Sequence, residues 1–417
     1  MTIKLKVITL FLAWWFLLLI YSSTNPLGLN PVRSFTYMLF VVFILTYTIS
    51  ITISFNFINK SSKLSSPLQS DRYDRLFSNN FIFCLLLIGF LANAFYAWKF
   101  LTVVIANNLF TEARLLRFEV GAVFSSNVEL LLYTWIIVPI ISLAKFLIAL
   151  AFVTGRFFKK NSLLAIVTAI AYLTFGAGRF IILDIISIYI FLRMILPKSK
   201  NKNSYKATSY YIPLFFLVTF SILPIYFRTG SINETEIISG LILAAEDSFQ
   251  HFFIYSIGPF RAFDTAYSKL WDQIGYGFGI YIFSSIHEPF AFINSFLGYP
   301  TIPSANQLGL FTQDNISIGN NISFNALYSG ILPAFLDFNI FGVILIGCIL
   351  GLSTSFMIYR SIIVGGIFEI FLASYLFNSS IMINYSWKLN SFASILPIII
   401  SAAYILLAKK SKSNLNN

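Results

Sequence analysis

Long apolar runs separated by short polar segments are the main pattern along this chain. A helix that crosses a bilayer needs about 20 mainly apolar residues. Ten runs come close to this length, at about 7–22, 35–55, 80–98, 128–153, 162–177, 180–197, 209–227, 338–358, 362–380 and 391–408. The pattern predicts an all-α polytopic integral membrane protein with about ten transmembrane helices. The first run lacks a small-x-small cleavage site after it, so we expect a retained anchor rather than a signal peptide.

Local signals predict further helices between the runs. Asn233 and Glu236 form an N-cap pattern before an apolar stretch at 237–257. Segment 108–121 places apolar residues on one face and charges on another, which is typical of an interfacial helix. Ser126 and Glu129 have the spacing of a capping box at the start of the fourth run.

Composition excludes the other broad classes. Of the 417 residues, 58% are hydrophobic and 11% are charged, which is too apolar for a soluble domain or a disordered chain. The net charge is 28 − 16 = +12, and we attribute it to basic cytoplasmic loops rather than to nucleic acid. Cys84 and Cys348 lie inside apolar runs, so neither a disulfide framework nor a thiolate metal site is expected.

The distribution of charge orients the chain. With both termini in the cytoplasm, seventeen basic residues fall on the cytoplasmic side with only two acids, Asp71 and Asp74. Nine basic residues and twelve acids fall on the opposite side. Short loops rich in Lys and Arg stay in the cytoplasm, so both termini are expected there.

One connection is much longer than the others and divides the chain into three regions. An N-terminal membrane region at 1–227 holds about seven spans. A large, partly helical outer loop follows at 228–337, and its apolar stretch 274–297 is expected to fold back onto the membrane surface. A C-terminal membrane region at 338–417 holds about three spans and a short cytoplasmic tail. Loops of this length are usually functional.

Three ionisable residues fall inside predicted spans, and such residues are often functional. At about 1.5 Å of rise per residue, Lys145 and Glu369 lie at matching distances from the cytoplasmic ends of their spans. Asp184 lies near the outer end of its own span. We therefore expect Lys145 to pair with Glu369, as a structural ion pair or a relay, and Asp184 to make an interhelical hydrogen bond.

The segment Phe175-Gly176-Ala177-Gly178-Arg179-Phe180 predicts a tight helical hairpin that turns at the outer membrane face. Arg179 would sit at its top, where a planar guanidinium suits a phosphate or pyrophosphate. Contact with ordinary lipid headgroups is the alternative.

The outer loop holds the other candidate residues. His251 follows Asp247 by four residues, so the two share a helix face and suit base chemistry, although a solvated pair is the alternative. Arg261 is a second candidate cation. His287 and Glu288 are neighbours, and we expect only one of them to act, because adjacent side chains point in different directions.

Several catalytic patterns are missing from the sequence. It contains no P-loop, no His-Glu-x-x-His and no Gly-x-Ser-x-Gly. ATP-driven transport, zinc chemistry and a serine-nucleophile elbow are therefore not expected.

Two short sequence motifs, one before the eighth run and one at its start, carry a family resemblance. The chain has Asn325-Ala326-Leu327-Tyr328, and then Asp337-Phe338-Asn339-Ile340-Phe341-Gly342. Their order resembles the C-terminal signature of Wzy-type oligosaccharide repeat-unit polymerases, which is Asn-x-aromatic followed by Asp-Phe-Gly-x-x-Gly. Asn339 stands where that family has its first Gly. The Gly-x-Gly-Arg hairpin also resembles the family's Arg-bearing turn.

The resemblance implies a multi-pass enzyme of the bacterial inner membrane. Such an enzyme joins undecaprenyl-pyrophosphate-linked glycans at the outer face, without a cofactor, a metal or nucleic acid. Arg179 and Arg261 would bind the pyrophosphate, and His287, Glu288 or His251 would act as the base. Supporting positions are Asp337, Asn325, Asp184, Arg114 and Arg117. Membrane lipid is a further partner, and a polysaccharide chain-length regulator is expected by the resemblance alone.

Other functions stay open from the sequence. A ligase-like transferase would use the same donor with another acceptor. A flippase or transporter would use Lys145, Asp184 and Glu369 as coupling charges. A glycosyltransferase that uses a lipid-phosphate sugar is less favoured, because the first outer loop, 22–34, contains no acid. A structural or receptor protein is the remaining class.

Overall fold

The computed structural model describes residues 3–59, 76–106, 120–176, 180–196, 237–299, 301–312, 316–320, 322–324, 329–385 and 387–414. Five of the described helices are long and apolar enough to cross a membrane: Ile3–Thr24, Ser34–Asn56, Asn80–Val104, Asn127–Thr154 and Ile331–Val364. Shorter apolar helices cover Lys160–Phe175, Ile367–Met382 and Phe392–Ile405. These helices indicate a helical, membrane-embedded protein. Every predicted run overlaps a helix except 209–227, which lies outside the described residues.

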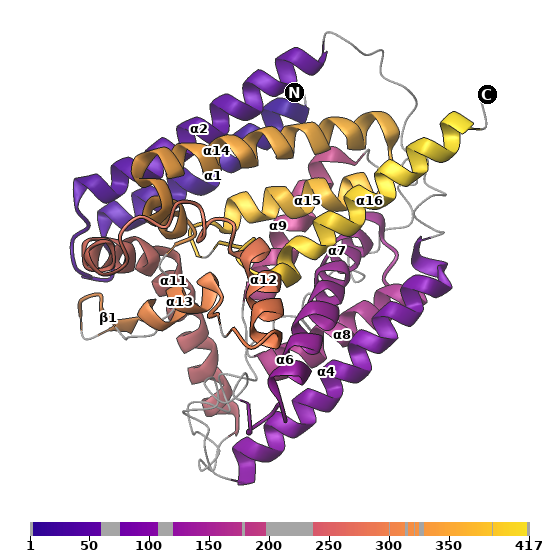
Figure 1. The fold of residues 1–417 in the computed structure, drawn as a ribbon, viewed down its shortest axis with the longest axis horizontal. Helices are drawn as coiled ribbons and strands as arrows, with labels where there is room; N and C mark the ends of the chain where they lie inside the picture. The colour runs from indigo at the N-terminus through magenta and orange to yellow at the C-terminus, as the bar shows by residue number, and fades with distance from the viewer. Residues whose placement is uncertain are drawn as a thin grey trace. The chain divides into compact units, whose positions relative to one another are not determined.

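Figure 1 shows the elements along the chain. In order they are α1 (Ile3–Thr24), α2 (Ser34–Asn59), α4 (Asn80–Ala106), α6 (Asn127–Leu132), η1 (Tyr133–Ile137), α7 (Val138–Thr154), α8 (Lys160–Gly176), α9 (Phe180–Ile195), α11 (Ile237–Ile274), α12 (Ser284–Phe296), α13 (Ser304–Thr312), β1 (Ile316–Ser317), β2 (Ser323–Phe324), α14 (Ile331–Val364), α15 (Ile367–Met382) and α16 (Phe392–Asn414). The strands form one antiparallel hairpin in which Ile316 pairs with Phe324.

Contacts divide the chain into two compact units. Unit 1 comprises Met1–Ser66 and Phe252–Asn417, and unit 2 comprises Pro67–His251. The division falls inside α11. Unit 1 thus joins the first two predicted spans to the last three and to most of the predicted outer loop.

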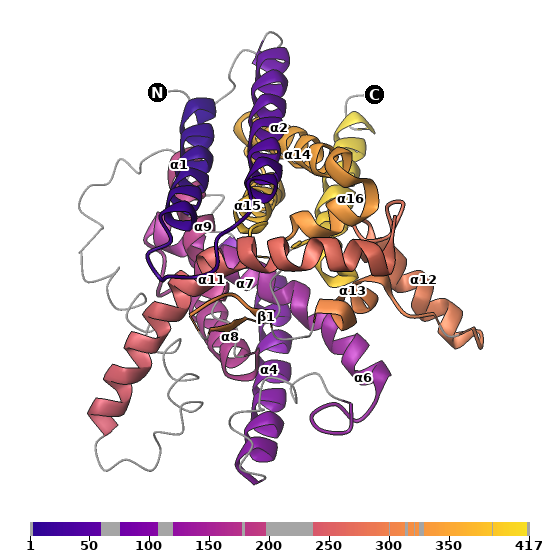
Figure 2. The same cartoon turned by 90° about the vertical axis from the view of Figure 1, so that its left-hand side faces the viewer.

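Unit 1 is built on the close pairing of α2 with α14, which lie side by side in both views (Figures 1 and 2). The two helices run in the same direction, since Phe35 contacts Phe335 and Gly347 lies against Thr46. A Cβ on Gly351 would lie 2.7 Å from the carbonyl oxygen of Tyr47. Small residues at this spacing let two membrane helices approach closely. The glycines of α14 therefore determine how near α2 can lie.

Aromatic side chains fill the space between α1 and α2. Phe11, Trp15, Phe43 and Tyr47 are fully buried. The rings of Phe11 and Tyr47 stack with their centroids 4.0 Å apart. This packing holds α1 against α2, and it leaves the connection between them, residues 25–33, at one end of the pair.

Unit 2 packs α7 against α8 and α9, and α4 against α8. A Cβ on Gly89 of α4 would lie 2.8 Å from Ile140, so α4 approaches α7 closely. The π-helical turn η1 comes directly before Pro139, which has no N–H to donate to the preceding turn. Tyr133 of this turn is buried and donates to Asn93 at 2.8 Å. The fourth predicted span is therefore three helical segments in succession.

The predicted local signals have different outcomes. The capping box is confirmed, because the Ser126 side chain accepts from the Glu129 N–H at 3.2 Å. The Glu129 carboxylate accepts from the N–H of Ser125, one residue earlier than the pattern specifies. A helix does begin at Ile237, but it continues past Pro259 to Ile274. Asn233, Glu236 and most of 108–121 lie outside the described residues.

Candidate functional site

The end of unit 1 at which α1 ends and α2 and α14 begin gathers four of the candidate residues: Arg261, His287, Glu288 and Asp337. We call it the loop end of unit 1. It consists of the α1–α2 connection, α11 from Phe252 onward, the β1–β2 hairpin, α12, and the first turns of α14 and α16. The backbone N–H of Asn30 donates to Ile318 in the hairpin at 2.7 Å, so the α1–α2 connection is fixed to the hairpin.

Arg261 lies buried inside this region, with 2% of its surface exposed. Its Nη2 donates to the backbone carbonyl of Ser22 at 3.1 Å and to Oδ1 of Asn25 at 2.9 Å. Its Nη1 donates to Oγ of Ser22 at 3.2 Å and to the carbonyl of Ile257 at 3.1 Å. The Ser22 carbonyl belongs to the last turn of α1, where the helix leaves carbonyls without partners and carries partial negative charge. Arg261 therefore ties α11 to the C-terminal end of α1.

These bonds leave little of the Arg261 guanidinium for a ligand. Four of its five N–H groups donate to neutral oxygens, and Nε has no hydrogen-bond partner. Among the described residues, no carboxylate forms an ion pair with it. Burial lowers its pKa, although an arginine still keeps its charge. The predicted pyrophosphate contact of Arg261 stays a prediction, and the one donor without a partner, Nε, is buried.

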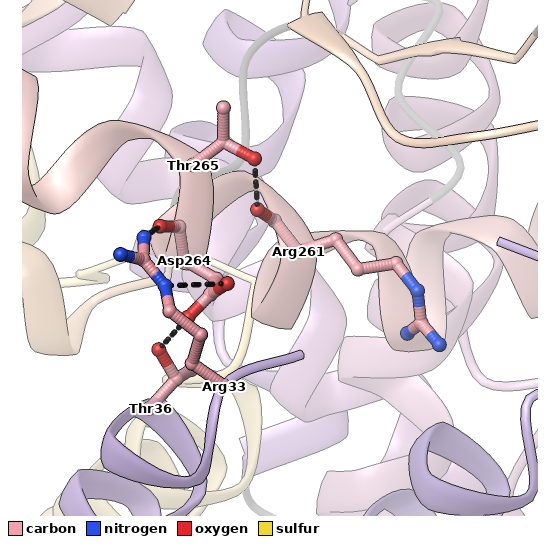
Figure 3. A network of polar contacts seen from close by, with 5 residues as sticks. All are labelled: Arg33, Thr36, Arg261, Asp264 and Thr265. Carbon is pink, nitrogen blue, oxygen red and sulfur yellow. Dashed lines mark hydrogen bonds and ion pairs between the residues drawn. The ribbon is translucent and has the colours of Figure 1, made fainter. Parts of the chain in front are cut away.

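Arg33, directly before α2, is the arginine at the loop end that combines a fixed position with exposure (Figure 3). Its Nε donates to Oδ2 of Asp264 at 3.1 Å, and its Nη2 donates to the backbone carbonyl of Asp264. Its guanidinium lies over the Tyr267 ring, 4.9 Å from the centroid. The side chain is nevertheless 53% exposed. Nη1 donates to no acceptor among the described residues, so both of its N–H groups can bind an anion.

Asp264 connects Arg33 to the buried part of the site. Its Oδ1 accepts from the hydroxyl of Thr36 in the first turn of α2 at 2.5 Å. Arg261 and Asp264 are close on α11, but Figure 3 shows their polar groups directed to opposite sides. One helix therefore fixes α1 through Arg261 and the start of α2 through Asp264. The sequence had marked Arg33 only as an outer basic residue, because Asp264 is distant along the chain.

Asp337 is fully buried and organises the turn before α12. It accepts the backbone N–H groups of Tyr281 at 3.2 Å and Ile282 at 2.6 Å. Gly277 packs so closely against Asp337 that a Cβ there would clash with the carboxylate. Asp337 is therefore a structural anchor for residues 277–282, and its supporting role in the site stays a prediction.

The residues after Asp337 bend α14. Phe338 and Asn339 have non-helical backbone angles, and Asn339 has φ 54° and ψ −141°. Beyond the bend, Gly342 packs directly against the carbonyl of Ala334, where a side chain would clash. A glycine adopts the conformation of Asn339 without strain. The backbone at Asn339 therefore has a conformation that favours Gly.

His287 and Glu288 of α12 have separate partners. The backbone N–H of Ser304 donates to Nδ1 of His287 at 3.1 Å. In the neutral imidazole this places the proton on Nε2, which then donates and cannot accept a proton. Oε2 of Glu288 accepts from the N–H of Phe392 at 2.7 Å, so the carboxylate lies at the positive N-terminus of α16. Each of the two neighbours therefore has an acceptor atom occupied by a backbone N–H, and a base role for either stays a prediction.

The predicted pairing of charges inside the membrane helices is wrong. Nζ of Lys145 lies 2.7 Å from Oδ2 of Asp184 in unit 2. Glu369 instead pairs with Arg360 in unit 1, at 3.5 Å. The comparison of depths failed because the position of Lys145 was counted from the cytoplasmic end of its span and that of Asp184 from the outer end. The predicted spans differ in length, so the two distances could not be compared. Lys145 and Asp184 both lie in the first halves of their helices, α7 and α9, which pack together.

The remaining predicted residues lie outside what the structure describes. They are Arg179, Asn325, Arg114, Arg117 and the side chain of His251. Helix α8 ends at Gly176 and α9 begins at Phe180. The turn between them, which carries Arg179, lies outside the described residues, so the predicted hairpin stays a prediction. Comparison of the chain with protein-family models, curated proteins and solved structures finds no match.

Proposed function

We propose that this chain polymerises undecaprenyl-pyrophosphate-linked oligosaccharide repeat units at the outer face of the bacterial inner membrane. The observation that supports this best is the geometry of Arg33. Its guanidinium is oriented by Asp264 and Tyr267, yet half of the side chain is exposed at the end of a membrane helix. A lipid-linked pyrophosphate is presented at that level, and the planar fork of N–H groups suits its oxygens.

The proposed reaction is a glycosyl transfer. A hydroxyl oxygen of the acceptor sugar attacks the anomeric carbon of the donor glycan and forms the new C–O bond. The bond from that carbon to the pyrophosphate oxygen breaks, and the lipid pyrophosphate leaves with the electron pair. The hydroxyl proton passes to a base of the protein. Fixed cations next to the pyrophosphate stabilise the charge that develops on it.

The described residues suggest how the roles are divided. Arg33 binds the pyrophosphate. Arg261 keeps the α1–α2 connection in place and so positions Arg33. Glu288 accepts the proton, whereas His287 serves as a donor through Nε2.

The test uses a strain from which the gene has been deleted, with surface glycan separated on a gel. Restoring the wild-type gene should restore a ladder of chain lengths. Arg33→Ala should leave a core that bears a single repeat unit, and Arg33→Lys should restore part of the ladder, since it keeps the charge without the fork. Immunoblots of membranes establish that each variant is present at the wild-type level.

Arg360 provides the matched control. It also pairs with a carboxylate, Glu369 at 3.5 Å, and lies near an aromatic ring, with Phe356 6.0 Å away. It lies toward the opposite end of α14 from Asp337. Arg360→Ala should therefore keep the ladder. A full ladder from Arg33→Ala, at normal protein levels, would refute the proposed pyrophosphate site.

The deletion itself distinguishes the other classes. Loss of all surface glycan with accumulation of lipid-linked units would favour the ligase-like transferase or the flippase. An unchanged ladder in the deletion strain would exclude glycan polymerisation. The flippase is the second candidate because Lys145 and Asp184 form an ion pair inside apolar helices, where charges often couple transport.

A further inference from the structure

Helix α12 (Ser284–Phe296) has its polar and apolar faces reversed with respect to a water-soluble protein. Ser284, Ser285 and Ala291 are buried against the rest of unit 1. On the other side, Ile286, Phe290 and Ile293 are exposed, with 60% of Phe290 accessible. Water-facing helices normally show the opposite pattern, with charged residues on the outer face.

The exposed apolar face continues into the turns on both sides of α12. Phe278 is 77% exposed before the helix, and Leu297 and Tyr299 are 65% and 74% exposed after it. Between 275 and 312, the sequence contains one carboxylate, Glu288, and one imidazole, His287. Both bond to other parts of unit 1. The outer surface of this element therefore carries no charge and presents mainly aliphatic and aromatic groups, with the polar Asn294 and Ser295 near the end of α12.

The polar face fixes α12 at the level where membrane helices begin. Glu288 accepts from the first N–H of α16 at 2.7 Å. Ser284 donates to the carbonyl of Asn390 at 2.7 Å, and Trp387 donates to the carbonyl of Ile282 at 2.8 Å. Asp337, near the start of the candidate span α14, holds the turn before α12. The apolar face is therefore attached at the end of the apolar helices, next to the surface that lipid covers.

We propose that α12 and its flanking turns insert into the outer bilayer interface as a fixed element that does not span the membrane. Lipid is the occupant that these observations favour, because the face adjoins membrane helices and carries Phe and Tyr, which settle at the interface. Since the face has no Lys or Arg, its insertion does not depend on anionic lipid. The proposal does not depend on the proposed enzymatic reaction.

The test measures how deeply α12 lies in the bilayer, with single-cysteine variants of the protein in nanodiscs. Cys84 and Cys348 are replaced by Ser, and cysteine is introduced at Phe290 and labelled with an environment-sensitive fluorophore. Ile349, partly exposed within α14, provides the deep lipid control, and Ser317, exposed in β1, provides the water control. The nanodiscs contain lipids that carry a nitroxide either near the headgroup or deep in the acyl chain. Each nitroxide quenches the fluorescence of a label that lies at its own depth.

A label at 290 should have blue-shifted emission, and shallow nitroxides should quench it more than deep ones. A label at 349 should be quenched more by deep nitroxides than by shallow ones, and a label at 317 should be quenched by neither. The result at 290 should be the same in neutral and anionic nanodiscs. If aqueous iodide quenched the label at 290 as strongly as the label at 317, insertion would be refuted. A blue-shifted label that neither iodide nor lipid quenches would mean that protein covers this face, which would also refute it.

The quenching pattern requires folded protein, so each labelled variant is first compared with wild type by size-exclusion elution and thermal midpoint. Phe290→Cys removes an exposed ring and should leave both unchanged. Ile293→Cys, on the same face, provides a second label if the first alters the elution. The same depth pattern at both positions is required, and disagreement between two folded variants would overturn the assignment of this face to lipid.

Discussion

Two arginines at the loop end of unit 1 show how neighbours of the same type differ in role. Arg261 is buried and donates four hydrogen bonds within the protein. Arg33 is half exposed, and its Nη1 donates to none of the described acceptors. Burial and the number of unused N–H groups separate a positioning residue from one that is able to bind a ligand.

Arg261→Met should destabilise the protein, because it removes the hydrogen bonds that α11 donates to the end of α1, including the one to the Ser22 carbonyl. The expected loss is about 3 kcal/mol in the free energy of unfolding. Arg33→Ala should cost less, about 1 kcal/mol, because Arg33 is half exposed and the buried Asp264 carboxylate keeps its hydrogen bond from Thr36. Thermal denaturation of the purified variants in one detergent compares the two. Equal midpoints would show that Arg261 does not hold α1 to α11.

The bend in α14 can be tested at Asn339. Asn339→Ala should lower stability by about 1–2 kcal/mol, because a Cβ is strained at positive φ and the local Asn side-chain bond is lost. That bond is donated by the N–H of Ile340 to Oδ1 at 2.8 Å. Asn339→Gly loses the same bond but removes the strain, so it should stay close to wild type. If Asn339→Ala had a higher thermal midpoint than Asn339→Gly, the positive φ at the bend would be contradicted.

At the scale of elements, helix pairs decide which charges meet. The close approach of α7 and α9 joins Lys145 to Asp184, and α14 and α15 join Arg360 to Glu369. Hydropathy along one helix reveals a buried charge but not its partner on another. The same holds for α12, whose exposed apolar face has a role only because its polar face is bonded to α16.

If Lys145 and Asp184 form a structural ion pair, substitutions there should have different effects on stability and glycan synthesis than if the pair is a proton relay. Asp184→Asn should cost about 3 kcal/mol, because it leaves a charged lysine without its partner. The double variant Lys145→Met, Asp184→Leu should recover most of that loss and keep the surface glycan. Thermal stability and the glycan ladder are measured together. A stable double variant that has lost all glycan would instead favour a transport role for the pair.

At the scale of the whole molecule, the distribution of charge predicts the orientation. In the single-cysteine background, a cysteine at Ser317 should react with a membrane-impermeant maleimide in cells whose outer membrane has been permeabilised. A cysteine at Lys410 should react only after lysis, since the C-terminal tail is expected in the cytoplasm. The reverse pattern would invert the topology and place the loop end of unit 1 in the cytoplasm, away from the proposed substrate.

Hydropathy alone located most of the described helices, because the need for an apolar stretch of a given length is a local property. The capping box at Ser126 was equally readable, since its partners are three residues apart. Those features depend on neighbours along the chain. The bend at Phe338 and Asn339 was not predicted, because Asn339 does not signal a positive φ as clearly as a glycine would.

Tertiary structure decided the rest, because it depends on residues that are far apart in the chain. Arg33 acquires its orientation from Asp264, and Arg261 loses most of its donors to α1. His287 is deprived of its accepting nitrogen by Ser304. A pattern of residue types shows which side chains have the right chemistry. Packing determines which of their atoms are still available, because each hydrogen bond within the fold removes one donor or acceptor from the candidate site.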